Sequence, residues 1–150
     1  MSLTSGSGIL THVFDHYGPP GPRDAGQRRN GVLISGESGK ALPYALFNLQ
    51  ERGRLLIDPG TEVYAGMVIG IHSRDNDLTV NPLKAKQLTN IRAAGSDENV
   101  ILTPPVRLDL EQALEFINDD ELVEITPRSV RVRKRWLKEH ERKRANRASA

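Results

Sequence analysis

The β-forming stretch near the middle of the chain reads Glu62-Val63-Tyr64-Ala65-Gly66-Met67-Val68-Ile69-Gly70-Ile71-His72. Its Val, Ile and Tyr residues favour a strand, and the preceding Asp58-Pro59-Gly60 favours a turn. Gly66 and Gly70 interrupt the stretch, and a glycine inside a strand commonly marks a sharp bend or a β-bulge. We therefore predict a long strand over residues 62–72 that is bent at its glycines.

The residues before this strand predict two further strands with a helix between them. The strands are Val32–Ser35 and Arg54–Ile57. Between them, apolar residues recur at helical spacing, at Leu42, Ala45, Leu46 and Leu49. Pro43 is tolerated in the first turn of this helix, and Gly53 can end it in the left-handed conformation.

The residues after the central strand predict a mixture of elements. Ser73–Pro82 is polar and indicates a loop, Lys84–Ala94 indicates a helix, and Val100–Leu102 indicates a strand. Asp109 is a good helix cap with Gln112 three residues later. An apolar stripe follows this cap, at Leu110, Ala113, Leu114 and Ile117.

The C-terminal end predicts two strands and a last helix. The strands Leu122–Thr126 and Ser129–Val132 lie on either side of Pro127, and the helix is expected from about Arg135 to Arg144. Strands interleaved with about three helices, and joined by short hairpin-like connections, indicate an α+β domain built on a curled, mostly antiparallel sheet.

The sequence of the first residues indicates the end of a preceding domain. Gly8–Tyr17 is rich in β-forming residues but has no obvious pairing partner, so we expect an orphan strand from a preceding domain. Gly18-Pro19-Pro20-Gly21-Pro22 can propagate neither a helix nor a ladder and indicates a linker. Met1-Ser2-Leu3 is typical of an expression leader. We thus divide the chain into residues 1–26, with leader, strand and linker, and residues 27–150, the domain with its basic tail.

The composition argues against several classes of protein. The 150 residues include no cysteine, so we expect neither a disulfide framework nor a thiolate zinc site, which suits the cytoplasm. No apolar run approaches the roughly 20 residues of a membrane span. His12 and His16 lie too far apart in an extended strand to chelate one ion easily. We expect no metal site, no cofactor in this chain and no membrane contact.

Positive charge is concentrated at the C-terminal end. Ten of the 21 Lys and Arg residues lie in residues 127–150 beside two Glu residues, a formal charge of +8, whereas the whole chain carries +2. Such a segment attracts polyanions, because bound phosphates release condensed counterions. RNA or DNA is therefore the first partner to consider, although a solvated basic tail that binds nothing has the same composition.

Two patterns that resemble catalytic motifs are weak. Gly36-Glu37-Ser38-Gly39-Lys40 lacks the first glycine of a phosphate-binding loop, where Ile34 stands, and the magnesium-binding hydroxyl, where Ala41 stands. We interpret it as a tight turn. His72 and Ser73 lie near two Asp residues, but a catalytic triad needs groups that converge from separate segments. We predict no catalytic residue, and a small hydrolase using His72 and Ser73 is kept as an alternative.

The polar segment after the central strand fits RNA better. Arg74 can contact phosphate, and polar side chains that can bond phosphate, the 2′-hydroxyl or base edges follow at Asn76, Thr79 and Asn81. Two cations come next, at Lys84 and Lys86. An ordinary loop whose Asp residues form turns would have a similar composition.

Several separate blocks of the chain carry a resemblance to a known family, namely Gln27–Ser35, Gly39–Ala41, Ala45–Gly53, Glu62–Arg74, Asn76–Asn81, Lys86–Ala93, Leu110–Ile117, Leu122–Pro127 and Arg131–Arg135. In order and spacing, these blocks resemble the C-terminal domain of the translational GTPase family BipA/TypA. The resemblance covers about Gly6 to Arg147. It implies a ribosome-binding module, since in this family the C-terminal domain contacts large-subunit rRNA and the acceptor end of an A-site tRNA.

The resemblance also implies features of a longer protein. In the family, a G domain that hydrolyses GTP with Mg precedes domains similar to those of elongation factor G, and ribosome assembly and the stress response are its implied settings. This chain has no counterpart of the G domain, so GTP and Mg would belong to the full-length protein. We expect a cytoplasmic, monomeric fragment that is not itself an enzyme and whose partners are the large ribosomal subunit, rRNA and tRNA.

From the residues and the resemblance together we predict two groups of RNA-binding residues. The recognition loop comprises His72, Ser73, Arg74, Asn76, Asp77, Thr79 and Asn81. Within it, Asp77 is expected to shape the loop rather than touch RNA. The basic surface that contacts phosphate comprises Lys84, Lys86, Arg92, Arg131, Arg133, Lys134 and Arg135. Trp136 and Leu137 are expected to pack on the body. A protein-interaction domain with a disordered basic tail is the second alternative.

Overall fold

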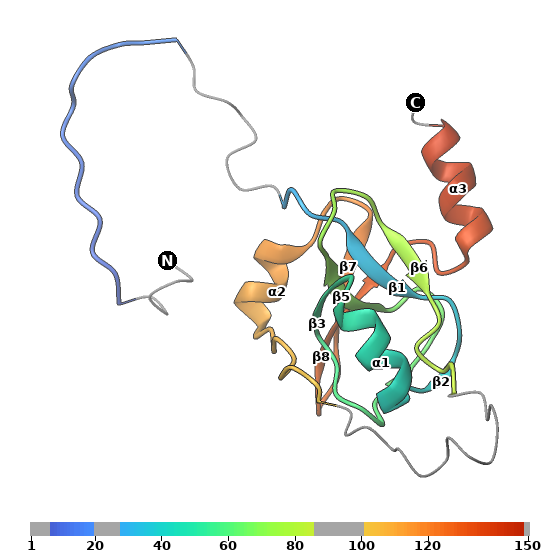
Figure 1. Cartoon of the computed structure of the whole chain (residues 1–150). Coiled ribbons are helices and arrows are strands. Elements are labelled where there is room, and N and C mark those ends of the chain that lie inside the picture. The colour runs from blue at the N-terminus through green and yellow to red at the C-terminus, as the bar shows by residue number, and fades with distance from the viewer. Residues whose placement is uncertain (1–6, 20–27, 86–100, 149–150) are drawn as a thin grey trace.

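A four-stranded sheet lies at the centre of the computed structural model, which describes residues 7–19, 28–85 and 101–148 (Figure 1). In sheet order its strands are β3 (Gly53–Leu55), β5 (Val68–His72), β1 (Val32–Ser35) and β6 (Leu78–Val80). β5 pairs antiparallel with both β3 and β1, whereas β6 pairs parallel with β1. β1 and β5 are therefore the inner strands, and β3 and β6 are the edges.

β1 is buried along its whole length, which explains its apolar sequence. Leu33 belongs to one hydrophobic cluster, whereas Val32 and Ile34 belong to another. Because successive side chains of a strand point to opposite faces, each face of the sheet carries its own core.

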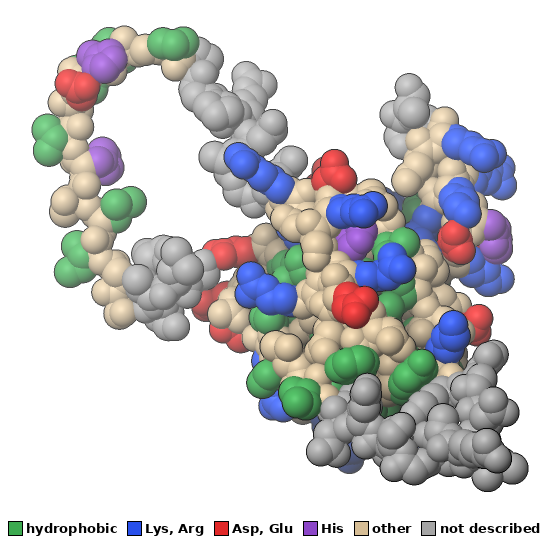
Figure 2. All heavy atoms as spheres, in the orientation of Figure 1, with side chains coloured by type: hydrophobic (Ala, Val, Ile, Leu, Met, Phe, Trp, Pro, Cys, Tyr) green, Lys and Arg blue, Asp and Glu red, His purple; other side chains and the backbone are tan. Residues whose placement is uncertain are grey.

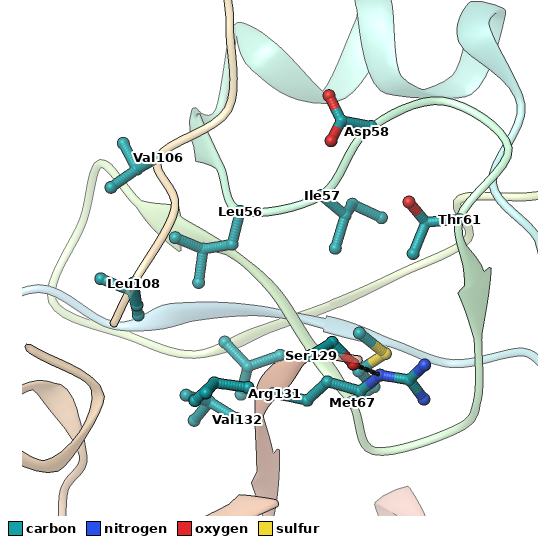
Figure 3. A pocket seen from close by; sticks show the side chains of 12 residues that line it. Leu56, Ile57, Asp58, Thr61, Met67, Val106, Leu108, Ser129, Arg131 and Val132 are labelled. Atoms are coloured by element: carbon teal, nitrogen blue, oxygen red, sulfur yellow. Dashed lines mark hydrogen bonds between the residues drawn. The ribbon is translucent and has the colours of Figure 1, made fainter. Parts of the chain in front are cut away.

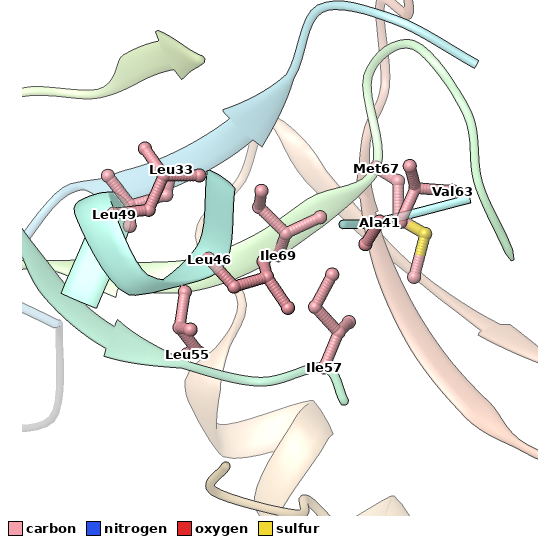
Figure 4. Packing of buried hydrophobic residues seen from close by; sticks show 9 residues of the cluster. All are labelled: Leu33, Ala41, Leu46, Leu49, Leu55, Ile57, Val63, Met67 and Ile69. Carbon is pink, nitrogen blue, oxygen red and sulfur yellow. The ribbon is translucent and has the colours of Figure 1, made fainter. Parts of the chain in front are cut away.

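The first core lies between the sheet and α1 (Pro43–Gln50). Leu46 and Leu49 of the helix pack with side chains of three strands, Leu33, Leu55 and Ile69 (Figure 4). Pro43 stands in the first turn, where its missing N–H costs no helical hydrogen bond. A short ladder joins β2 (Gly39–Lys40) to β4 (Glu62–Val63).

The second core is made with α2 (Leu110–Phe116) and with the hairpin of β7 (Glu121–Ile125) and β8 (Val130–Lys134). Ala113 of α2 and Val132 of β8 are fully buried in it. Asp109 caps α2, because its carboxylate accepts from the Gln112 N–H at 2.7 Å, and the Gln112 side chain accepts from the Asp109 N–H at 3.2 Å. This reciprocal capping box sets the start of the helix.

The predicted α+β class is confirmed. Three helices lie within the described ranges, and every strand pair found there is antiparallel except β1 with β6. The strand at Val32–Ser35, the helix after Asp109 and the C-terminal hairpin are also confirmed. The 62–72 stretch bends as predicted, but it forms two strands, β4 and β5, with Gly66 at a φ of 89° between them.

Several predicted element boundaries are wrong. Gly53 does not end α1 in the left-handed conformation but begins β3, where a Cβ would lie 1.8 Å from the Ile71 carbonyl oxygen. Ser73–Pro82 is not loop throughout, since it contains β6. The last helix, α3 (Glu139–Ala148), begins later than predicted, because the Arg135 N–H still bonds the Asp120 carbonyl oxygen at 2.8 Å.

The predicted strand over Gly8–Tyr17 has no regular secondary structure, and its apolar side chains are exposed, for example Val13 at 92%. A strand gains little stability outside a larger sheet, and among the described residues no sheet includes this segment. The predicted helix over residues 84–94 lies largely outside the described residues, and residues 101–102 form no strand. In the part of the chain that is described, no helix is long and apolar enough to span a membrane.

Replacing Gly66 by Ala is expected to destabilise the protein more than replacing Gly60 by Ala. Both glycines have positive φ, 89° and 81°, so each Ala costs about 1–2 kcal/mol of backbone strain. At Gly66 the new Cβ would also lie 2.7 Å from the Cα of Leu137, whereas nothing lies within 4 Å at Gly60. Urea unfolding of the two variants measures the difference, and equal losses would contradict the close packing of Leu137 on Gly66.

Candidate functional site

The polar loop, residues 73–77, joins β5 to β6 and is held by backbone bonds to both neighbouring segments. The Gly31 N–H donates to the Arg74 carbonyl oxygen at 2.8 Å. The Ser73 N–H and its hydroxyl both donate to the Arg52 carbonyl oxygen at 2.8 Å. Arg74 and Asn76 nevertheless have exposed side chains. The loop is therefore an ordered projection that presents a cation and an amide to solvent.

His72 lies beneath this loop rather than on its surface. It is 5% exposed, and its Nδ1 lies 2.5 Å from the Asn76 carbonyl oxygen. Its own carbonyl oxygen accepts from the Asn30 side chain at 2.9 Å. His72 is thus buried, and its ring supports the loop, while its predicted contact with RNA stays a prediction.

Asp77 ties the end of the loop to the body. One of its carboxylate oxygens accepts from the Val32 N–H at 2.9 Å, and the other lies 2.5 Å from the ammonium of Lys134. This carboxylate is thus engaged on both oxygens in shaping the loop.

Lys134 is the centre of a buried ionic network. Its side chain is 1% exposed, and its ammonium contacts the carboxylates of Asp77 at 2.5 Å, Asp120 at 2.7 Å and Glu121 at 2.9 Å. Burial lowers the pKa of Lys134, but the hydrogen bonds to these carboxylates outweigh burial and raise the pKa above its ordinary value. Lys134 therefore stays charged and is bound to these three carboxylates, while its predicted contact with phosphate stays a prediction.

Glu121 extends the network to Arg28, in the segment before β1. Its carboxylate receives two bonds from the guanidinium of Arg28, at 2.8 and 2.9 Å, and its side chain is fully buried. The Arg28 guanidinium also lies 4.3 Å from the ring centre of Phe116. Burial alone would raise the pKa of Glu121, but the bonds from Arg28 and Lys134 bring it below its ordinary value of 4.5.

Sequence reasoning missed this network, although one signal could have found it. In β8, Val130 and Val132 pack in the second core, and the alternation of a strand places Lys134 on their face. A lysine on the apolar side of a strand needs acidic partners, and Asp120 and Glu121 stand at the start of the paired strand.

The remaining predicted loop residues lie beyond the loop itself. Thr79 is in β6, and its hydroxyl accepts from the Arg142 guanidinium at 3.1 Å. The Asn81 side chain accepts from the Leu83 N–H at 2.8 Å and forms a turn after β6. Both residues therefore lie outside the segment of residues 73–77, and their predicted contacts with RNA stay predictions.

The predicted basic surface divides into separate parts. Arg135 is exposed next to the network, whereas Lys84 is exposed beyond the opposite end of β6. Arg131 and Arg133 are half-buried near Tyr64, whose hydroxyl donates to Glu124. Two further predicted cations, Lys86 and Arg92, lie outside the described residues.

Arg131 also lines a small pocket of about 160 Å³ between residues 56–61 and β8 (Figure 3). Its guanidinium donates to the Ser129 hydroxyl at 3.1 Å, while Leu56, Met67 and Leu108 supply apolar walls. The pocket holds no set of groups arranged for catalysis. Arg131 therefore lines a pocket to which none of residues 73–77 contributes.

The arrangement gives no support to the hydrolase alternative. The Ser73 hydroxyl donates to the Arg52 carbonyl oxygen, and the His72 ring faces the Asn76 carbonyl oxygen, so neither side chain activates the other. Gly39 and Lys40 form β2, which differs from a phosphate-binding loop at the start of a helix. Among the described residues, no three His, Asp or Glu side chains form a candidate metal site.

Comparison with known proteins identifies the family. Residues 30–139 match the TypA/BipA C-terminal domain, which is most of the region just described. The chain belongs to the TypA/BipA family. The match extends from the start of β1 through the network of Lys134 to the first residue of α3, so the polar loop and the hairpin are both parts of this TypA/BipA domain.

Several relatives of this TypA/BipA domain carry the name large ribosomal subunit assembly factor BipA. The one from Escherichia coli strain K12 is 62% identical over 148 residues, and the one from Haemophilus influenzae is 60% identical over 149 residues. Both alignments cover 99% of this chain but 24% of the relative. The chain therefore spans about a quarter of the length of these relatives.

Replacing Lys134 by Met is expected to destabilise the protein by about 3 kcal/mol, the lower end of the cost of breaking a buried ion pair. The lower end applies because Asp77 and Asp120 are partly exposed, with side-chain exposures of 36% and 51%. The matched control is Lys143→Met, which removes an exposed pair with Glu139 and should cost far less, because exposed ion pairs contribute little to stability. Similar losses in urea unfolding of the two variants would contradict the central role of Lys134.

Glu121 is expected to make stability fall at acidic pH. Its pKa is lower in the folded protein than in the unfolded chain, so its contribution is present above pH 4.5 and is lost as the pH falls through the folded value. Below pH 4.5 the free energy of unfolding should therefore fall more steeply for the parent than for Glu121→Gln. Glu62→Gln, at an exposed position, is the control that should follow the parent curve.

Proposed function

We propose that this chain is the ribosome-binding C-terminal module of a large-subunit assembly factor. Family membership and the names of the relatives support a ribosomal role. The main support for a direct contact with RNA is the polar loop, which exposes Arg74 and Asn76. The ion pair of Asp77 with Lys134 holds the basic C-terminal segment beside this loop. In this proposal, the loop and its neighbouring cations contact large-subunit rRNA and the acceptor end of an A-site tRNA.

The charges near the loop fit such a partner. Lys134 contacts the carboxylates of Asp77 and Asp120 and offsets part of their negative charge beside the exposed cations. Arg74 and Arg135 are exposed on either side of this network. Figure 2 shows Lys and Arg side chains over the top of the body and over α3. Phosphate groups are the polyanion that such cations bind with release of counterions.

The longer protein would supply what this chain lacks. We propose that it is a cytoplasmic GTPase whose nucleotide and Mg are held in another domain, so this module contributes binding and no catalysis. The protein-interaction alternative assumed a disordered basic tail, whereas residues 139–148 form α3. An ordered cationic helix favours a surface of fixed shape over a flexible tail.

The double variant Arg74→Gln/Arg135→Gln is expected to weaken binding to large ribosomal subunits. Each lost phosphate contact should reduce the slope of log affinity against log salt by about one unit or less. Cosedimentation with purified large subunits at several salt concentrations measures both quantities. The melting temperature should hardly change, because both side chains are exposed.

The matched control is Arg54→Gln/Arg128→Gln, which removes the same charge from exposed positions on β3 and on the hairpin turn. The affinity and the salt slope of this control should stay closer to those of the parent than the values of Arg74→Gln/Arg135→Gln do. Equal effects of the two double variants would mean that only net charge matters, and unchanged binding of Arg74→Gln/Arg135→Gln would reject the proposed surface.

A further inference from the structure

A groove of about 660 Å³ lies between β6 and α3 and is separate from the tip of the polar loop. Leu78 and Thr79 of β6 line one side, and Arg142 and Lys143 of α3 line the other. Arg135 and Trp136 line the segment that connects β8 to the helix. The volume is in the range of pockets that hold small organic ligands.

Trp136 is the unusual residue in this groove. The sequence predicted that it packs on the body, but its side chain is 45% exposed, and it is the only tryptophan of the chain. The next residue, Leu137, makes the close contact with the body at Gly66. The Arg135 guanidinium lies 5.7 Å from the centre of the indole ring. An aromatic ring is thus kept partly accessible beside a cation.

The walls of the groove are fixed to each other by one arginine. The Arg142 guanidinium donates to the carbonyl oxygen of Leu137 at 2.5 Å and to that of Trp136 at 3.2 Å. Its other nitrogen donates to the Thr79 hydroxyl at 3.1 Å. Arg142 therefore joins the first turn of α3 to β6 and to the segment that contains Trp136. These bonds fix the two walls of the groove relative to each other.

The charges of the groove are arranged unevenly. Its carboxylates are partly compensated, since Asp77 and Asp120 share the single charge of Lys134 and Glu139 pairs with Lys143 at 2.7 Å, while Asp119 also lines the groove. Beyond the groove, exposed cations continue along the C-terminal segment, at Lys138, Arg144 and Arg147. A ligand with a flat uncharged part and a chain of negative groups matches this pattern.

We propose that the groove holds one unpaired nucleotide of an RNA strand, with its base stacked on Trp136 and its phosphates near Arg135 and α3. Base stacking on an exposed aromatic ring beside cations is the usual mode of single-stranded RNA binding. An RNA strand fits better than a free nucleotide, because the cations extend past the groove. This inference rests on the proposed RNA-binding function and adds a specific base site to it.

The lone tryptophan supplies a direct test. A short single-stranded oligoribonucleotide should quench the fluorescence of Trp136 in a saturable, salt-dependent manner. A nucleoside monophosphate of the same base should bind much more weakly, and an RNA duplex without unpaired residues should quench little. Trp136→Phe is the optical blank, because it removes the only tryptophan.

Variants then locate the site. Arg135→Gln should weaken quenching by the oligonucleotide severalfold, whereas Arg128→Gln, an exposed change of equal charge on the hairpin turn, should not. In a filter-binding assay Trp136→Ala should lower affinity at least about fivefold, which corresponds to about 1 kcal/mol of base stacking. Trp136→Phe should lose less, because it retains a ring. Thermal melting of both variants shows whether they remain folded.

The outcomes separate this inference from the proposed function. If the oligonucleotide leaves the parent fluorescence unchanged, the nucleotide site is rejected, even where large-subunit binding persists through Arg74 and Arg135. If the monophosphate binds as tightly as the oligonucleotide, the assignment to an RNA strand is rejected. If the oligonucleotide binds but large subunits do not cosediment, the base site stands and the ribosomal role fails.

Discussion

The ammonium of Lys134 is the group on which the arrangement of this domain depends. A buried ammonium loses its hydration, and the loss is offset only when nearby carboxylates satisfy it. Here the three carboxylates come from two separate segments, the polar loop and the start of β7. The end of β8 can be buried only if both segments meet it. Glu121 then binds Arg28, so the residues just before β1 join the same network.

The need of the Lys134 ammonium for carboxylate partners affects the order of the binding surface more than the size of the hydrophobic core. The loop is held at Arg52, at Gly31 and, through Asp77, at Lys134, so its exposed residues are already ordered before a partner arrives. A preformed surface loses less conformational entropy on association than a flexible loop does. The same network holds the segment that leads to Trp136 and α3, because Arg135 bonds to the Asp120 carbonyl oxygen.

Because of this network, fewer cations of the C-terminal segment are available for binding than its formal charge indicates. The formal +8 of residues 127–150 includes the buried Lys134 and the half-buried Arg142, which are both bonded to other residues of the fold. The cations that remain available are those of the loop, the connecting segment and α3. A positive C-terminal sequence thus becomes a smaller set of oriented side chains, some structural and some exposed.

Local patterns determined much of the secondary structure from sequence alone. The Asp109 capping box, the apolar β1 and the hairpin of β7 and β8 depend on neighbours within a few residues, so their predictions are confirmed. The family resemblance, carried by blocks along the chain, is also confirmed. The RNA-contact residues stay predictions, although the burial of His72 and Lys134 removes these two from the surface.

Tertiary structure alone decided which polar residues became internal. β6 was not visible in the sequence, because a three-residue edge strand is defined by its parallel pairing with β1, far away in the chain. Gly53 was assigned to a helix end because the close approach of Ile71 has no local signature. Lys134 looked like a surface cation for the same reason, since its charge is compensated by carboxylates that only folding brings together.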